Sequence, residues 1–228
     1  MNGYTASHTG TESSRTYLSY ISKGGPRYLW EHTESQLLRG LLKGRPENHL
    51  RLLDLACGNG RAGSALVDVA STVIGVDYSA EQMNHLVNDE ILLSRGDACH
   101  LPFSNDAFDV VVTLRFYSNA EDALRVGSLR EVNRVLASEG VLLCSVHNVP
   151  RTLPNLARQL ARVIRHKNQP RWISRRIVER QFADAGFMTR QRISYGLIGS
   201  LRSRGGLRAL LLPALGYDLY VLSKRRQK

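Results

Sequence analysis

The sequence has few cysteines and no long apolar run, which argues against a disulfide-stabilised protein and against one that spans a membrane. Its three cysteines, Cys57, Cys99 and Cys144, are odd in number and far apart. They indicate reduced thiols rather than a disulfide framework or a metal site. No stretch of about 18 uninterrupted apolar residues occurs, and the first twenty residues lack the apolar segment of a signal peptide. We therefore expect a cytoplasmic protein without a bound metal.

What the sequence does contain is enough for one domain with a full core: 228 residues, of which 43% are hydrophobic and 22% charged. The net charge of +11 is uneven, because residues 151–228 hold 18 Lys and Arg against 3 Asp and Glu. Such a segment can bind nucleic acid, a phospholipid surface or an anionic substrate. A general bias toward arginine produces the same count.

Residues 49–77 predict a strand, a loop of small residues, a helix and a second strand that ends on Asp77. Gly58 and Gly60 allow a ligand close to the backbone, because neither has a Cβ. In open α/β sheets, ligands bind beyond the carboxyl ends of the strands. Asp77 follows Gly60 at about the spacing at which such folds offer an acid to a ribose diol. The stretch therefore predicts a site for a nucleoside.

Two kinds of nucleoside ligand fit this loop: a dinucleotide with a pyrophosphate, and a nucleoside that carries a positive charge. Residues 58–63 (GNGRAG) match the dinucleotide pattern G-x-G-x-x-G, in which a helix amino terminus faces a pyrophosphate. However, Asp54 precedes Gly58, and Ala56 and Cys57 lengthen the turn. A carboxylate beside the turn suits a cationic ligand better than a pyrophosphate.

Apolar runs and helical periodicity alternate along the rest of the chain. We expect strands at 51–55, 72–76, 91–98, 108–114, 141–146, 190–194 and 217–222, and helices at 27–42, 61–70, 80–88, 124–136 and 177–186. This alternation is typical of a parallel sheet covered on both faces.

Three segments resemble known motifs. Residues 54–60 (DLACGNG), 76–83 (VDYSAEQM) and 96–103 (GDACHLPF) are similar to the motifs D-x-G/A-x-G-x-G, V-D-x-S-x-x-M and G-D-A-x-x-L-P-F. Through them the chain resembles class I S-adenosylmethionine-dependent methyltransferases over about residues 52–146. The resemblance implies a Rossmann-like, doubly wound α/β fold with a mostly parallel seven-stranded sheet and helices on both faces.

The resemblance also implies S-adenosyl-L-methionine as the cofactor. Asp77 would accept both ribose hydroxyls and Asp97 the adenine amino group, whereas Asp54 either orders the loop or touches the ligand. The implied cofactor residues are Asp54, Ala56, Cys57, Gly58, Asn59, Gly60, Asp77, Tyr78, Met83, Gly96, Asp97, Ala98 and Leu114.

Methyl transfer asks little of side chains, because the sulfonium already activates the methyl group and the protein has only to align the acceptor. A base is needed only when the acceptor is a protonated oxygen or a carbon acid. The loops after the fourth and fifth strands offer His147 as the preferred base and Tyr117 as a second candidate. A surface or capping role for His147, and a pocket-wall role for Tyr117, are the alternatives.

We expect a disordered tail (1–15) and then a single domain (16–228). This domain would comprise a helical cover (16–48), a cofactor-binding core (49–148), a basic insertion (151–176) and a carboxyl-terminal helix and strands (177–228). The insertion has an apolar helical face and is interpreted as a substrate lid. Peripheral membrane contact and nucleic-acid binding are its alternatives.

Together these patterns predict a methyltransferase that acts on a small organic acceptor, with the oligomeric state undetermined. Three alternatives stay open: an RNA methyltransferase that uses the basic carboxyl-terminal half, a nicotinamide-dependent oxidoreductase, and a non-catalytic relative that serves as a partner protein.

Overall fold

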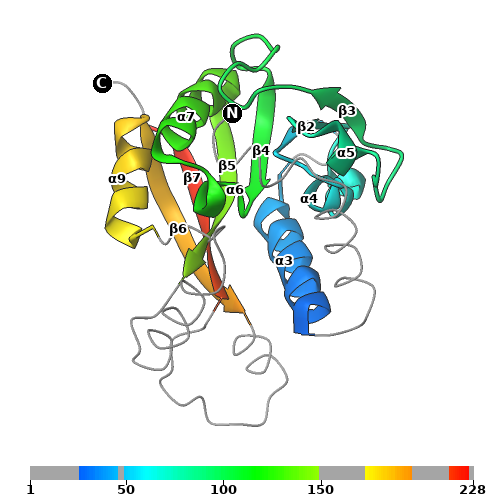
Figure 1. Ribbon diagram of the computed structural model, residues 1–228, viewed down its shortest axis with the longest axis horizontal. Helices are drawn as coiled ribbons and strands as arrows, with labels where there is room; N and C mark the ends of the chain where they lie inside the picture. Colours follow the sequence, from blue (N-terminus) through cyan, green and yellow to red (C-terminus); the bar gives the residue numbers. More distant parts are fainter. Residues whose placement is uncertain (1–25, 46–48, 149–172, 197–215, 226–228) are drawn as a thin grey trace.

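The computed structural model describes residues 26–45, 49–148, 173–196 and 216–225, which form a sheet with helices packed on it (Figure 1). The strands are β1 (Arg51–Leu55), β2 (Thr72–Asp77), β3 (Leu92–Arg95), β4 (Phe108–Leu114), β5 (Leu136–Asn148), β6 (Phe187–Gly196) and β7 (Gly216–Lys224). The helices are α3 (Pro26–Leu42), α4 (Arg61–Ser64), α5 (Ala80–Met83), α6 (Phe116–Asn119), α7 (Asp122–Val135) and α9 (Arg175–Asp184), with a 3-10 turn, η1, at Val67–Val69.

The seven strands lie in the order β3-β2-β1-β4-β5-β7-β6. The first five in that order are mutually parallel, whereas β7 is antiparallel to both β5 and β6. The chain passes from β1 outward to β3 and then returns to β4 on the other side of β1. This reversal is the switch point at which open sheets bind their ligands. The predicted fold class, a mostly parallel seven-stranded sheet, is confirmed.

Helices cover both faces of the sheet, as predicted. On one face the core contains Leu38 and Leu42 of α3 together with Ala62 of α4. On the other it contains Leu129 of α7 and Phe182 of α9. Burial on both faces explains why β1 and β4 are almost continuously apolar in sequence.

Two predicted helices are much shorter than their periodicity indicated. The helix predicted over 61–70 divides into α4 and η1, and the one predicted over 80–88 ends at Met83. After α5 the amide of Val87 donates to the carbonyl oxygen of Asn59 at 3.0 Å instead of continuing a helix. A tertiary hydrogen bond to residues 56–60, the loop between β1 and α4 that we call the ligand loop, therefore replaces the helical one.

Other boundaries also differ. β3 is shorter than the strand predicted over 91–98. β5 extends beyond the predicted 141–146 at both ends, and its pairing with β4 shifts register near its start. The four-residue helix α6 was not predicted. Ser174 caps α9 through a hydrogen bond from the Ile177 amide, so residues 175 and 176 belong to this helix rather than to the basic insertion. Residues 1–15 and 151–172 lie outside the described residues.

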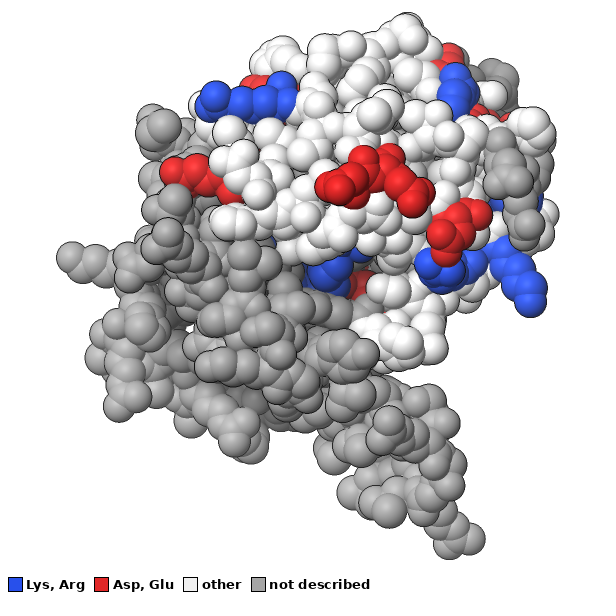
Figure 2. All heavy atoms as spheres, turned by 90° about the vertical axis from the view of Figure 1, so that its right-hand side faces the viewer, with Lys and Arg blue, Asp and Glu red and all other residues white. Residues whose placement is uncertain are grey.

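No helix in the described part of the chain is long and apolar enough to cross a bilayer. Figure 2 shows the side of the molecule where β3 and α5 lie. On this face the Lys and Arg side chains of the described residues lie beside Asp and Glu side chains rather than in one continuous basic patch.

The packing of α9 generates a stability prediction. Phe182 is 1% exposed, and its ring centroid lies 6.3 Å from that of Tyr117 and 5.3 Å from that of Tyr220. We expect Phe182→Ala to lower the free energy of unfolding by about 3–5 kcal/mol, because it removes buried area and leaves a cavity. Urea denaturation measures this loss. Ile177→Ala on the same helix is the control, since Ile177 is 49% exposed, and an equal loss in both variants would contradict the packing described.

Candidate cofactor site

The loop between β1 and α4 has an unusual backbone. Ala56, Gly58 and Gly60 have φ angles of 56°, 56° and 76°. Left-handed conformations cost an L-residue about 1–2 kcal/mol, so glycine suits two of these three positions. The Gly60 amide donates to the carbonyl oxygen of Cys57 at 2.9 Å, which closes a tight turn. The loop thus presents its backbone beyond the carboxyl end of β1.

Asp77 at the end of β2 holds this loop from the side. One carboxylate oxygen accepts the Gly58 amide at 2.8 Å, and the other accepts the Ser79 amide at 2.8 Å. A Cβ placed on Gly58 would meet no described atom within 4 Å. As far as the described residues go, the space next to Gly58 is therefore open, beside the Asp77 carboxylate.

Asp54 of β1 bonds to α4, directly after the loop. Its side chain is buried, and it accepts the Gly63 amide at 2.7 Å. Burial raises the pKa of Asp54 to about 7, against the lowering effects of the Gly63 hydrogen bond and of Arg61. A Cβ on Gly63 would lie only 3.2 Å from this carboxylate. These contacts favour the loop-ordering role of Asp54 over direct contact with the ligand.

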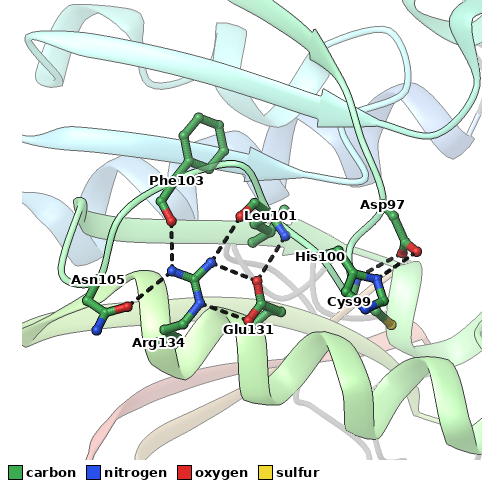
Figure 3. Close-up of polar contacts among 8 residues, drawn as sticks. All are labelled: Asp97, Cys99, His100, Leu101, Phe103, Asn105, Glu131 and Arg134. Atoms are coloured by element: carbon green, nitrogen blue, oxygen red, sulfur yellow. Dashed lines mark hydrogen bonds and ion pairs between the residues drawn. The ribbon is translucent and has the colours of Figure 1, made fainter.

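Asp97 organises the turn after β3 (Figure 3). One carboxylate oxygen accepts the Cys99 amide at 2.8 Å, and the other lies 3.2 Å from Nδ1 of His100. The Gly96 amide donates to the Asp77 carbonyl oxygen at 3.0 Å. The turn that contains Asp97 is thereby tied to the same strand end as the ligand loop.

Arg134 of α7 fixes the chain that follows this turn (Figure 3). Its guanidinium donates to the carbonyl oxygens of Leu101 and Phe103 at 3.0 and 2.7 Å, and to the Asn105 side chain at 3.1 Å. Glu131 pairs with Arg134 and accepts the Leu101 amide at 2.9 Å. These bonds satisfy the backbone of a connection without regular structure. Sequence reasoning did not assign Glu131 or Arg134 a role.

The other predicted cofactor residues surround these turns. Asn59 and Met83 are buried, and Tyr78 is 46% exposed beneath the guanidinium of Arg95. Cys57 is buried, and burial raises the pKa of its thiol, so it is a packing residue. Half-buried side chains belong to Ala56, Ala98 and Leu114.

The two predicted catalytic residues lie in different surroundings. Tyr117 is 1% exposed in the core, with its ring against those of Phe116 and Phe182. Burial also raises the pKa of its hydroxyl well above the ordinary value. These surroundings favour a packing role for Tyr117, and its exchange of a proton with an acceptor stays a prediction.

His147 lies near the carboxyl end of β5 beside Tyr217, with ring centroids 4.6 Å apart. Its backbone amide donates to the Ser118 hydroxyl at 2.7 Å, while its Nδ1 atom is buried and has no hydrogen-bond partner among the described residues. Burial, with Arg115 nearby, lowers the pKa of His147 to about 4. The imidazole is therefore neutral at physiological pH.

The site also contains an acid that sequence reasoning did not identify. Glu34 of α3 is 1% exposed, and its carboxylate pairs with Arg61 at 2.8 Å and with Arg115 at 3.0 Å. Burial by itself would raise the pKa of Glu34, but the two arginines and a hydrogen bond from Tyr195 hold it below its ordinary value. The helical periodicity could have indicated that Glu34 is buried, because Glu34 shares its helical face with Leu38 and Leu42.

Known proteins resemble this chain in both sequence and fold. Residues 53–144 match the protein family described as methyltransferase domain. Demethylmenaquinone methyltransferases are similar in sequence: that of Lactobacillus johnsonii is 35% identical over 99 residues, and that of Lactiplantibacillus plantarum is 33% identical over 135 residues. These matches span 39% and 54% of this chain, and 40% and 53% of the relatives. The chain therefore spans about half the length of the curated relatives it matches.

Solved structures share the fold at low sequence identity. The PH0226 protein of Pyrococcus horikoshii OT3 has a TM-score of 0.70 and 21% identity, over 94% of this chain and 99% of that one. Geranyl diphosphate C-methyltransferase of Streptomyces coelicolor A3(2), solved with S-adenosyl-L-homocysteine, has a TM-score of 0.63 and 16% identity, over 85% and 79%. The domain match and the shared fold confirm the resemblance to class I S-adenosylmethionine-dependent methyltransferases.

The raised pKa of Asp54 generates a prediction about pH. The folded protein holds a proton on Asp54 up to about pH 7, whereas the unfolded chain releases it near the ordinary value of 3.8. Its stabilising contribution is therefore complete below about pH 4 and is lost as the pH rises through 7. The free energy of unfolding of the wild type, relative to Asp54→Asn, should fall over this interval by at most about 4 kcal/mol.

Urea denaturation of both proteins at pH 4, 5.5 and 8 measures this difference. Asp89→Asn is the matched control, because Asp89 is exposed and its replacement should leave the pH dependence unchanged. A constant difference between wild type and Asp54→Asn across these pH values would contradict the assigned proton.

Proposed function

We propose that this protein binds S-adenosyl-L-methionine at the carboxyl ends of β1, β2 and β3 and transfers its methyl group to a small organic acceptor. The single observation that carries the proposal is the pairing of the Asp77 carboxylate with the Gly58 amide at 2.8 Å, beside the space next to Gly58 that the described residues leave open. A carboxylate has lone pairs for about four donors, so Asp77 can accept ribose hydroxyls while it keeps its two backbone bonds.

The charge of the site supports a cationic ligand over a dinucleotide. A pyrophosphate would need the free amides at the start of α4. Here the Gly63 amide already donates to Asp54, and α4 is only four residues long. The Asp77 carboxylate lies beside the loop, which disfavours a pyrophosphate and suits a sulfonium. This arrangement favours the methyltransferase over the nicotinamide-dependent alternative.

The protein residues would have simple tasks. Asp77 would hold the ribose and Asp97 the adenine amino group, while Gly58 and Gly60 would let the cofactor lie against the backbone. When bound, the cofactor supplies an electrophilic methyl group. His147 is the proposed proton acceptor for acceptors that must lose a proton, because its Nδ1 has no partner among the described residues. Its pKa of about 4 makes the ring a weak base at neutral pH, so this role requires the bound acceptor to raise that pKa.

The names of similar proteins support a small organic molecule as the acceptor. Demethylmenaquinone and geranyl diphosphate appear in the names of similar proteins, and both are small molecules rather than nucleic acids or proteins. Residues 151–172, which we predict to form a lid, would complete the acceptor side of the same domain.

Isothermal titration calorimetry with S-adenosylhomocysteine and with NADH tests the proposal directly. We expect saturable binding of S-adenosylhomocysteine and none of NADH. A methylation assay with labelled cofactor should then be run on small-molecule extracts and on total RNA. Binding of NADH alone, or methyl transfer to RNA alone, would overturn the proposal, and binding without turnover on either fraction would favour a non-catalytic partner protein.

Replacement of Asp77 should weaken cofactor binding. Asp77→Ala removes a charged acceptor, and such hydrogen bonds contribute about 1.5–3 kcal/mol. The dissociation constant for S-adenosylhomocysteine should therefore rise roughly 10- to 150-fold. Asp89→Ala, at an exposed acid between α5 and β3, should bind like the wild type. Unchanged affinity in Asp77→Ala would remove Asp77 from the site.

A further inference from the structure

The buried carboxylate of Glu34 contacts residues from three other segments at the end of the sheet where the parallel strands terminate. The same oxygen of Glu34 lies 2.8 Å from a nitrogen of Arg61 and 3.0 Å from a nitrogen of Arg115. Its other oxygen accepts the hydroxyl of Tyr195 on β6. Glu34 belongs to α3, so this single side chain ties the covering helix to this end of the sheet.

The two arginines follow the two strands that flank the switch point. Arg61 comes directly after Gly60 of the ligand loop, and Arg115 comes directly after β4. β1 and β4 are neighbours in the sheet. Arg115 also has a left-handed backbone, with φ of 66°, and its amide donates to the Ser145 hydroxyl at 2.9 Å. Both residues are thus held at turns whose shape decides where a ligand can lie.

The charge of Glu34 is what allows both guanidinium groups to converge on one point. The side chains of Arg61 and Arg115 are only 17% and 13% exposed, so water screens their mutual repulsion poorly. Removing one partner of a buried ion pair leaves an uncompensated charge. Without the carboxylate, both arginines would have to move, and each would move the loop that carries it.

We propose that Glu34 is a positioning residue for cofactor binding, which acts through Arg61 on the ligand loop and through Arg115 on the loop after β4. This inference rests on the proposed function, because it takes S-adenosylmethionine as the ligand of the loop. It adds a residue from the helical cover to a site otherwise composed of the strand ends.

The test compares the affinity for S-adenosylhomocysteine with thermal stability in the full chain. Glu34→Gln, which removes the charge and keeps the size, should raise the dissociation constant at least tenfold. Glu34→Asp keeps the charge on a shorter side chain and should lie between Glu34→Gln and wild type. Arg39→Gln on the same helix is the matched control, since Arg39 forms an exposed pair with Asp68, and it should stay within twofold of wild type.

A double variant distinguishes positioning from a general loss of stability. If Glu34 acts through Arg61, Glu34→Gln combined with Arg61→Gln should bind little worse than the weaker single variant, because the pair is already broken. Fully multiplicative losses would contradict that route. A lower melting temperature in Glu34→Gln with affinity within twofold of wild type would overturn the proposal. If Glu34→Gln does not fold, unchanged affinity in Glu34→Asp overturns it instead.

Failure of the proposed function has a different signature. In that case the wild type itself would not bind S-adenosylhomocysteine, whatever residue stands at position 34.

Discussion

The site at the carboxyl ends of the strands depends on two aspartate side chains that accept backbone amides. Asp77 accepts the Gly58 amide and Asp54 the Gly63 amide, at 2.8 and 2.7 Å. A loop with three left-handed residues is costly in isolation. These two bonds hold its middle, at Gly58, and the helix that follows it, at Gly63. Because each acid projects from a strand, the rigid sheet determines the shape of the loop.

The position of this site follows from the order of the strands. β1 and β4 are neighbours although the chain passes through β2 and β3 between them. Their carboxyl ends therefore bring together residues from distant parts of the sequence. At the same edge of the sheet, Tyr217 at the start of β7 lies beside both His147 near the end of β5 and Arg115 after β4.

Prediction from the sequence succeeded where local patterns and burial agree. β4 is an apolar run interrupted only by Asp109 and Thr113, and its predicted and observed bounds coincide at 108–114. Prediction failed where a tertiary bond competes with a local one. The helix expected over 80–88 stops at Met83, since the Val87 amide bonds to Asn59 of the ligand loop. The assigned cofactor residues stay predictions. Asp77, the last residue of β2, bonds to Gly58 of one turn and to Gly96 at the start of the turn that contains Asp97.

The sequence by itself determined the alternation of strands and helices, the glycine loop and the acid after β2, because each is encoded within a few residues. Only the tertiary structure decided that Tyr117 is enclosed in the core and that Glu34 meets Arg61 and Arg115. The reason is physical: periodicity shows which side of a helix is buried, but the partner of a buried charge comes from another strand end. That partner becomes known only when the sheet has assembled.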